Sequence, residues 1–224
     1  MPTLDVPLCV VGDVRVYLRR ASSLGSADGL TDAERARATR LRRPQARRQF
    51  VAARQLLRRL LGEELGCRPG EVPLAIDRYG KPYLAGHPGP AFNLSHSTGL
   101  IVVAIAMNGQ VGIDIEPLRT RVEPLTGAGS ILAPEEQQAL AALPDSLRPA
   151  AFQWYWTAKE AYVKARGLGM RLAFDRFTVC PPAHGLIGSW RVRHAGTRSA
   201  GSAISIYSTD VVPGYALAVA VEAR

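Results

Sequence analysis

The sequence predicts an α/β (α+β) protein with two similar subdomains, 1–110 and 111–224, each a small sheet packed with one long helix. In each half, apolar residues recur at helical spacing over one long segment, 45–65 and 149–166. Short apolar runs bounded by Gly, Pro and Asn surround these segments, as is typical of strands. The chain has 224 residues, 47% of them hydrophobic and 21% charged, which is enough to bury a core.

Local signals mark the elements of the first half. Thr31-Asp-Ala-Glu34 has the pattern of a capping box and starts a short helix that Pro44 stops or kinks. Gly66 ends the long helix. Asn108-Gly109 predicts a tight hairpin turn into the second half. The expected strands of the first half cover 10–18, 83–84, 91–94 and 100–107, and the polar residues 95–99 connect the last two.

The second half has a similar plan. An acidic strand over 111–116 is closed by Pro117, and residues 120–130 predict a loop. The long helix ends at Gly167. The remaining expected elements are a helix over 134–143 and strands over 174–180, 188–193, 202–208 and 215–221.

The charge balance points to an anionic ligand or partner. The net charge is +9, and no acid interrupts the arginines between 35 and 60. They are Arg35, Arg37, Arg40, Arg42, Arg43, Arg47, Arg48, Arg54, Arg58 and Arg59. A solvated helical face or a nucleic-acid-binding module would also account for such a segment. No run reaches the ~20 apolar residues of a membrane helix, and the first residues do not resemble a signal peptide, so we expect a cytoplasmic protein with no membrane contact.

Three acids and a lysine form a candidate metal and phosphate site. In the acidic strand, Asp114 and Glu116 alternate with apolar residues and share one face, roughly 6.6 Å apart. Glu160 and Lys164 lie one turn apart on the long helix of the second half. Carboxylates at this spacing suit Mg²⁺, and the lysine can hold a phosphate. A solvent-facing strand and an ordinary Glu–Lys surface pair are the alternatives.

Polar residues of the first half extend this picture. Ser95 and His96 follow a short strand, where polar groups can reach a phosphate, and Lys81 stands in the turn Gly80-Lys-Pro82. With the carboxylates and Lys164, they indicate a ligand rich in phosphate.

Taken in order, these segments resemble the 4′-phosphopantetheinyl transferase superfamily, in its Sfp-type, monomeric branch. The stretches that carry the resemblance are Arg48-Gln-Phe-Val-Ala52, Tyr79-Gly-Lys-Pro82, Phe92-Asn-Leu-Ser-His96, Val111-Gly-Ile-Asp-Ile-Glu116 and Trp156-Thr-Ala-Lys-Glu-Ala-Tyr-Val-Lys164. The last two together are highly specific. The resemblance implies two pseudo-symmetric halves with mainly antiparallel sheets.

The resemblance also implies a reaction and its residues. Coenzyme A would be the donor, and Mg²⁺ would be the cofactor, which Mn²⁺ can replace. Phosphopantetheine would move to a serine of an apo carrier protein, and 3′,5′-ADP would leave. Asp114, Glu116 and Glu160 would bind the metal. The residues expected to contact coenzyme A are Arg43, Arg47, Arg48, Lys81, Ser95, His96, Lys159 and Lys164. Lys164 would also stabilise the leaving group, and either Glu160 or Glu136 would take the proton of the serine.

The implied partners are apo carrier proteins or carrier domains of peptide, polyketide or fatty-acid synthases, which serve secondary metabolism among other pathways. Carrier proteins are typically acidic, so the positive charge can steer them. We expect them to dock on the loop 120–132, near Leu118, Leu125 and Ile131. The alternatives are an arginine-rich module that binds nucleic acid, which explains none of the acids, and an inactive homologue that only binds carrier proteins.

Overall fold

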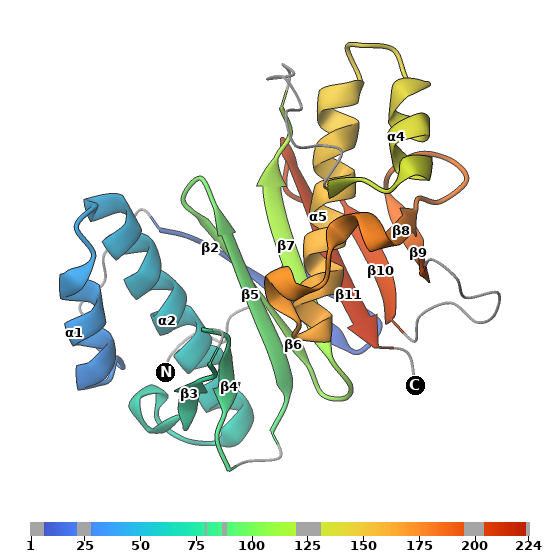
Figure 1. The fold of residues 1–224 in the computed structure, drawn as a ribbon. Coiled ribbons are helices and arrows are strands. Elements are labelled where there is room, and N and C mark those ends of the chain that lie inside the picture. The colour runs from blue at the N-terminus through green and yellow to red at the C-terminus, as the bar shows by residue number, and fades with distance from the viewer. Residues whose placement is uncertain are drawn as a thin grey trace. The chain divides into compact units, whose positions relative to one another are not determined.

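The structure, a computed structural model, describes residues 7–21, 28–78, 80–86, 89–119, 131–194 and 204–222 (Figure 1). The chain divides into two compact units, Met1–Asn108 and Gly109–Arg224, each of which is described by itself. Both contain antiparallel strands and one long helix, so the predicted α/β fold class is confirmed. Within the described ranges, no helix combines the length and the apolar character that a membrane span requires.

The first unit is built on a four-stranded antiparallel sheet in the order β1-β2-β6-β5. Its elements are β1 (Cys9–Val11), β2 (Val14–Arg20), α1 (Asp32–Arg40), α2 (Pro44–Leu65), η1 (Pro69–Glu71), β3 (Leu74–Ile76), β4 (Pro82–Leu84), β5 (Ala91–Ser97) and β6 (Leu100–Ala106). Helix α2 packs against the sheet through Leu57 and Leu61, which meet Tyr17, Ile101 and other apolar residues of the strands in one buried cluster. Strands β3 and β4 form a separate two-stranded ribbon.

The second unit is built on a five-stranded antiparallel sheet in the order β7-β11-β10-β9-β8. Its elements are β7 (Val111–Pro117), α4 (Pro134–Ala141), α5 (Arg148–Arg166), η2 (Gly169–Arg171), η3 (Phe174–Arg176), β8 (Phe177–Cys180), β9 (Gly188–His194), β10 (Ile204–Thr209) and β11 (Tyr215–Glu222). Helix α5 lies across one face of this sheet (Figure 1). Its Tyr155 packs edge-on against Trp190 of β9, with ring centroids 5.2 Å apart.

The helix ends follow the sequence signals. The Thr31 hydroxyl accepts the Glu34 N–H at 3.3 Å and the Glu34 carboxylate accepts the Thr31 N–H at 3.0 Å, which completes the capping box. Pro44 is the first residue of α2, where its missing N–H costs nothing, and does not kink a continuous helix. Gly66 and Gly167 end the two long helices with φ of 65° and 66°, a conformation that glycine adopts without strain.

Four local predictions were wrong. The single strand expected over 10–18 is a hairpin of β1 and β2, with Gly12 and Asp13 as its turn. Strand β5 continues through Ser97, so Ser95 and His96 belong to the strand and not to a polar connection. The turn after β5 consists of Thr98 and Gly99, whose φ angles of 44° and 82° are both positive, as in the two-residue turns that are common in hairpins.

The other two concern the second unit. Asn108-Gly109 does not close a hairpin, because β7 pairs with β11. The segment 174–180 opens with the short helix η3, and its strand begins only at Phe177.

Candidate functional site

The strand that carries the acidic motif directs its carboxylates toward helix α5. Along β7, Gly112, Asp114 and Glu116 alternate with apolar residues and therefore share one face of the sheet. A Cβ built on Gly112 would lie 2.0 Å from the carbonyl oxygen of Ala161 in α5, so this face is the one that α5 covers. The carboxylates thus face a helix, which excludes the solvent-facing strand considered as an alternative.

Small residues let α5 approach the sheet closely. Ala158, Ala161 and Ala165 lie on one side of the helix and are buried, with exposed fractions of 0%, 0% and 1%. Alanines of β11 face them, and one of these, Ala218, pairs with Asp114 across the two strands. No long side chain separates helix from strand, and polar residues at the border of the alanine stripe can therefore reach β7.

Lys164 and Asp114 make the direct contact between the two elements. The Nζ of Lys164 donates to Oδ1 of Asp114 at 2.6 Å, and the two side chains are 27% and 5% exposed. A partly buried ion pair of this kind is stronger than a surface pair, because solvent screens it less. The lysine that was considered as half of a Glu–Lys surface pair on α5 thus pairs with Asp114 of the strand.

Glu160 belongs to the same electrostatic group. Burial raises the pKa of Glu160 above its ordinary value; Lys164 opposes this shift, and the negative charges of Asp114 and Glu116 add to it. Three carboxylates and one ammonium group thus influence one another on the covered face of β7.

The donor set fits magnesium, which prefers carboxylate oxygens. Burial is the main cause of the raised pKa of Glu160, and a cation would offset the repulsion from Asp114 and Glu116 that adds to it. In the parts of the chain that the structure describes, however, no three His, Cys, Asp or Glu side chains are already arranged to hold a metal ion. Asp114 is instead held by Lys164. Binding of a metal by Asp114, Glu116 and Glu160 thus stays a prediction, and it would require these side chains to move.

Lys159 and Glu136 form a buried pair, and neither occupies the place expected of it. Lys159 Nζ lies 2.8 Å from Glu136 Oε2, and the two side chains are 0% and 1% exposed. The ammonium also donates to the carbonyl oxygens of Phe174 and Phe177, at 2.7 and 2.6 Å. Lys159 therefore has no exposed atom with which to contact coenzyme A in this structure.

Glu136 is fully engaged inside the unit. Its carboxylate accepts the backbone N–H groups of Ala133 and Val179, at 2.7 and 2.6 Å, in addition to the Lys159 ammonium. These bonds tie the start of α4 to β8 and α5. Glu136 is thus enclosed within the unit, and the choice between Glu136 and Glu160 as the base stays a prediction.

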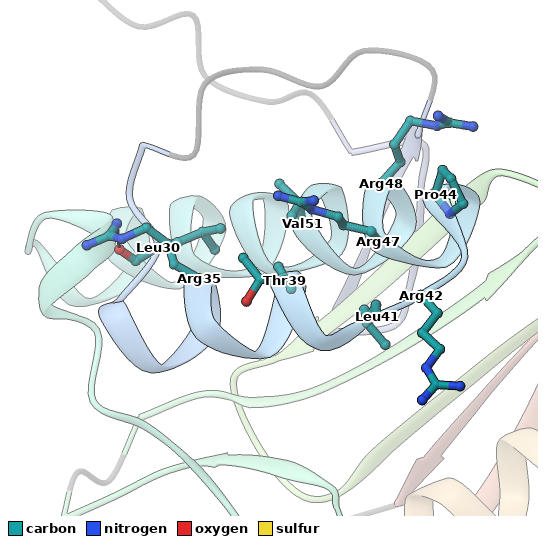
Figure 2. Close-up of a pocket in the computed structure, with 10 residues that line it drawn as sticks. Leu30, Arg35, Thr39, Leu41, Arg42, Pro44, Arg47, Arg48 and Val51 are labelled. Atoms are coloured by element: carbon teal, nitrogen blue, oxygen red, sulfur yellow. Dashed lines mark hydrogen bonds between the residues drawn. The ribbon is translucent and has the colours of Figure 1, made fainter.

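In the first unit, helices α1 and α2 border a cavity of about 580 Å³ (Figure 2). Its wall includes the buried apolar residues Leu30, Ala38 and Val51. Four arginines line it: Arg35, Arg42, Arg47 and Arg48. In Figure 2, Arg35 lies at the Leu30 end, Arg42 and Arg48 lie at the Pro44 end, and Arg47 lies between them.

This arrangement sharpens the prediction for the arginine-rich segment. Arg47 and Arg48 line the cavity as a ligand contact would. Arg43 occupies the N-cap position of α2 without a capping hydrogen bond from its side chain, and it is not among the lining residues. Arg35 and Arg42 were not singled out from the sequence. No local pattern distinguishes them from the other arginines; the packing of α1 on α2 selects them.

Two arginines of this segment are structural. The Nε of Arg58 pairs with Glu34 at 2.7 Å, and its Nη1 donates to the carbonyl oxygens of Pro69 and Val72, both at 3.0 Å. Arg54 lies 3.9 Å from the same Glu34 and over the ring of Phe50. Both arginines are buried. In the sequence, Glu34 comes just before the arginine-rich segment 35–60, which contains no acid; in the structure, Glu34 lies beside two arginines of that segment. The uncompensated positive charge of the segment is therefore smaller than the sequence suggests.

The remaining predicted contacts of the first unit lie on β5 and before β4. Ser95 and His96 are consecutive in a strand and point to opposite faces, and His96 is exposed. Lys81 is half-buried; burial lowers its pKa, and Asp77, whose carboxylate accepts the Lys81 N–H at 2.9 Å, opposes the shift. Ser95 and His96 therefore do not form one cluster of polar side chains.

The predicted docking loop lies mostly outside the described residues, which omit 120–130 and with them Leu125. Leu118 and Ile131, on either side of it, pack partly buried against the core of the second unit. Tyr79 of the Gly-Lys-Pro turn is also outside the described residues.

Comparison with known proteins points to the family that the motifs resemble. A family model described as the 4′-phosphopantetheinyl transferase superfamily matches residues 110–220, which include the acidic strand and α5. The chain is 42% identical over 144 residues to the 4′-phosphopantetheinyl transferase HetI of Nostoc sp., a match that covers 63% of this chain and 61% of the relative.

Two further relatives carry the same family name. A putative 4′-phosphopantetheinyl transferase of Synechocystis sp. is 34% identical over 143 residues, covering 63% of this chain and 58% of the relative. The 4′-phosphopantetheinyl transferase Sfp of Bacillus subtilis is 27% identical over 164 residues, covering 73% and 69%. The matched part of the chain thus spans only about three fifths of the length of the first two relatives. The chain belongs to the 4′-phosphopantetheinyl transferase superfamily.

Proposed function

We propose that the protein transfers the 4′-phosphopantetheine group of coenzyme A to a serine of an apo carrier protein and releases 3′,5′-ADP. The observation that carries the proposal is the set of charged groups between β7 and α5, in which Lys164 meets Asp114 at 2.6 Å beside Glu160. The family match covers this set, and its relatives are named as phosphopantetheinyl transferases. We expect a monomer that acts in the cytoplasm.

The arginine-lined cavity of the first unit supports a nucleotide donor. The apolar wall of Leu30, Ala38 and Val51 can pack against a base, and Arg47 and Arg48 can neutralise phosphate. In our proposal these two arginines hold the nucleotide end of coenzyme A. Lys81, Ser95 and His96 remain proposed contacts of its phosphates.

The charged groups of the second unit supply what phosphoryl transfer needs, which is mainly positioning and neutralisation of charge. Lys164 would hold the diphosphate of the donor and stabilise the oxygen that leaves. Glu160 would take the proton of the attacking serine through a carboxylate oxygen that the metal leaves free.

Magnesium held by Asp114, Glu116 and Glu160 would, when bound, neutralise charge on the diphosphate. The three carboxylates are suitable oxygen donors, as described above. The side chains would bind and orient the donor. Asp114 lies on a paired strand, and the buried alanines of α5 hold that helix, with Glu160 and Lys164 on it, against the sheet.

Peptidyl and acyl carrier domains of peptide, polyketide and fatty-acid synthases are the proposed acceptors. The net charge of +9 favours an acidic partner. The loop 120–132 remains the proposed docking surface.

The test is direct. The protein is incubated with coenzyme A, Mg²⁺ and several apo carrier domains, and mass spectrometry looks for phosphopantetheine on the serine. We expect an adduct with at least one carrier, none in EDTA, and none with Asp114→Ala. Turnover that survives EDTA would refute the role of the metal, and the absence of any adduct would refute the proposed activity. Salt-dependent binding to DNA in place of transfer would favour the nucleic-acid alternative.

A further inference from the structure

The carboxylate at the centre of the proposed metal site already has a cation beside it. The Lys164 ammonium contacts Asp114 at 2.6 Å, a typical length for a charge-assisted bond. Glu160, one turn before Lys164 on α5, interacts electrostatically with Lys164 and with the two carboxylates of β7, Asp114 and Glu116. One ammonium among three carboxylates takes the electrostatic position that a divalent cation would take.

The two partners differ in their freedom to move. Asp114 is 5% exposed on a strand that pairs with β11 along its whole length, so its backbone is fixed. Lys164 is 27% exposed, and its four-carbon stem lets the ammonium swing without any change in α5. If a metal ion binds to Asp114, Lys164 is the partner that must leave.

We propose that Lys164 is the resting counter-ion of this site and competes with the divalent cation for Asp114. Metal binding displaces the ammonium, which then becomes available to the diphosphate of the donor. Metal and donor therefore bind more tightly together than separately, and Lys164 sets the size of that coupling. The inference rests on the proposed function, because it concerns the same metal and donor.

The physical reason is competition between two cations for one carboxylate, because a metal ion on either oxygen of Asp114 repels the ammonium that Lys164 places against Oδ1. A metal ion that binds without donor must break the Lys164–Asp114 pair and leave the ammonium with no phosphate to meet. When coenzyme A is present, its diphosphate pairs with the displaced ammonium, and this new ion pair offsets the free energy lost with the Lys164–Asp114 pair. Couplings of this kind are commonly ~5–150-fold in affinity.

The test uses Mn²⁺ as the probe and isothermal titration calorimetry as the readout, with and without coenzyme A. Without coenzyme A, we expect Lys164→Met to bind Mn²⁺ about tenfold more tightly than the unaltered protein, because the competitor is gone. With coenzyme A, the affinity for Mn²⁺ should rise more in the unaltered protein than in Lys164→Met. Lys164→Arg keeps a cation and should bind Mn²⁺ as weakly as the unaltered protein.

Arg166→Met is the matched control. It removes one positive charge from the exposed end of the same helix and measures the long-range electrostatic effect alone. If Lys164→Met gains no more affinity than Arg166→Met, the competition does not exist and the inference is wrong.

Two further outcomes are informative. If Lys164→Met fails to fold without metal, Mn²⁺ should restore its circular dichroism spectrum by taking the place of the lost counter-ion, and failure to do so would overturn the inference. If the unaltered protein binds no Mn²⁺ even with coenzyme A, then the proposed metal site itself fails. The second result is distinguishable from the first, because it is seen without any substitution.

Discussion

Gly112 is the point at which β7 and α5 come closest, and its replacement by alanine is a demanding test of the site. The new Cβ would lie 2.0 Å from the carbonyl oxygen of Ala161 and 2.4 Å from the backbone nitrogen of Ala165. Both neighbours are backbone atoms of a helix, so no flexible side chain can yield. Ordinary contact begins at 3.4 Å, and the two elements must therefore separate by about 1.4 Å, the difference from 2.0 Å.

The separation has an energetic and a functional consequence. Overpacking costs ~1–3 kcal/mol in typical cores, and a rigid backbone clash places Gly112→Ala near ~3 kcal/mol. At roughly 2–4 °C per kcal/mol for a chain of this size, the melting temperature should fall by roughly 6–12 °C. With side chains in their present conformations, the 2.6 Å contact between Lys164 and Asp114 would open to about 4 Å, the limit for an ion pair.

Gly70→Ala is the control for the loss of a glycine. The φ of Gly70 is not positive, and the nearest atom to its added Cβ is the Gly29 carbonyl oxygen, at 4.0 Å. We expect Gly70→Ala to change stability by at most about 1 kcal/mol, with a gain as the expected sign. Thermal melts followed by circular dichroism compare the two. If Gly112→Ala melts within 2 °C or so of Gly70→Ala, the reasoning about close approach is refuted.

Three further experiments test the remaining contacts. Arg58→Met removes a buried guanidinium that holds the partly buried Glu34 carboxylate and two carbonyl oxygens, and it should cost ~3–5 kcal/mol in urea unfolding. Arg42→Met, at the rim of the cavity, should stay within ~0.5 kcal/mol. Lys159→Met and Glu136→Gln should each be strongly destabilising, but the double variant should lose less than their sum by ~1 kcal/mol or more; additive losses would contradict the buried pair. Glu160→Gln should abolish transfer yet raise the metal-free melting temperature at pH 8. Because burial raises the folded-state pKa of this acid, the gain in melting temperature should vanish as the pH falls through that pKa. A lower melting temperature of Glu160→Gln at pH 8 would contradict this reasoning.

The sequence predicted the elements whose signals are local. The alternation of Gly112, Asp114 and Glu116 places both acids on one face, and the helical spacing of Glu160 and Lys164 places both on α5. These periodicities are properties of short segments, and they survive into the folded chain.

What the sequence could not supply is which groups meet across long separations. Arg58 and Glu34 are 24 residues apart and Lys164 and Asp114 are 50 apart, and no local pattern specifies either pair. Lys159 is the clearest case. In the sequence, a charged residue in the helical motif predicts a position on the surface or a contact with a ligand. Only the packing of α4 against α5 shows that Glu136 and two carbonyl oxygens bury it.

The two-residue turn between β5 and β6 has a consequence for the site that goes beyond its own geometry. Thr98, with φ of 44°, is β-branched in a conformation that such residues rarely adopt, and the pairing His96–Ile101 depends on the turn having this length. One residue more in the turn would slip β5 by one position and exchange the faces on which Ser95 and His96 lie. The length of the hairpin therefore decides which of the two side chains faces α2, so an insertion there would change the proposed ligand contacts without replacing Ser95 or His96.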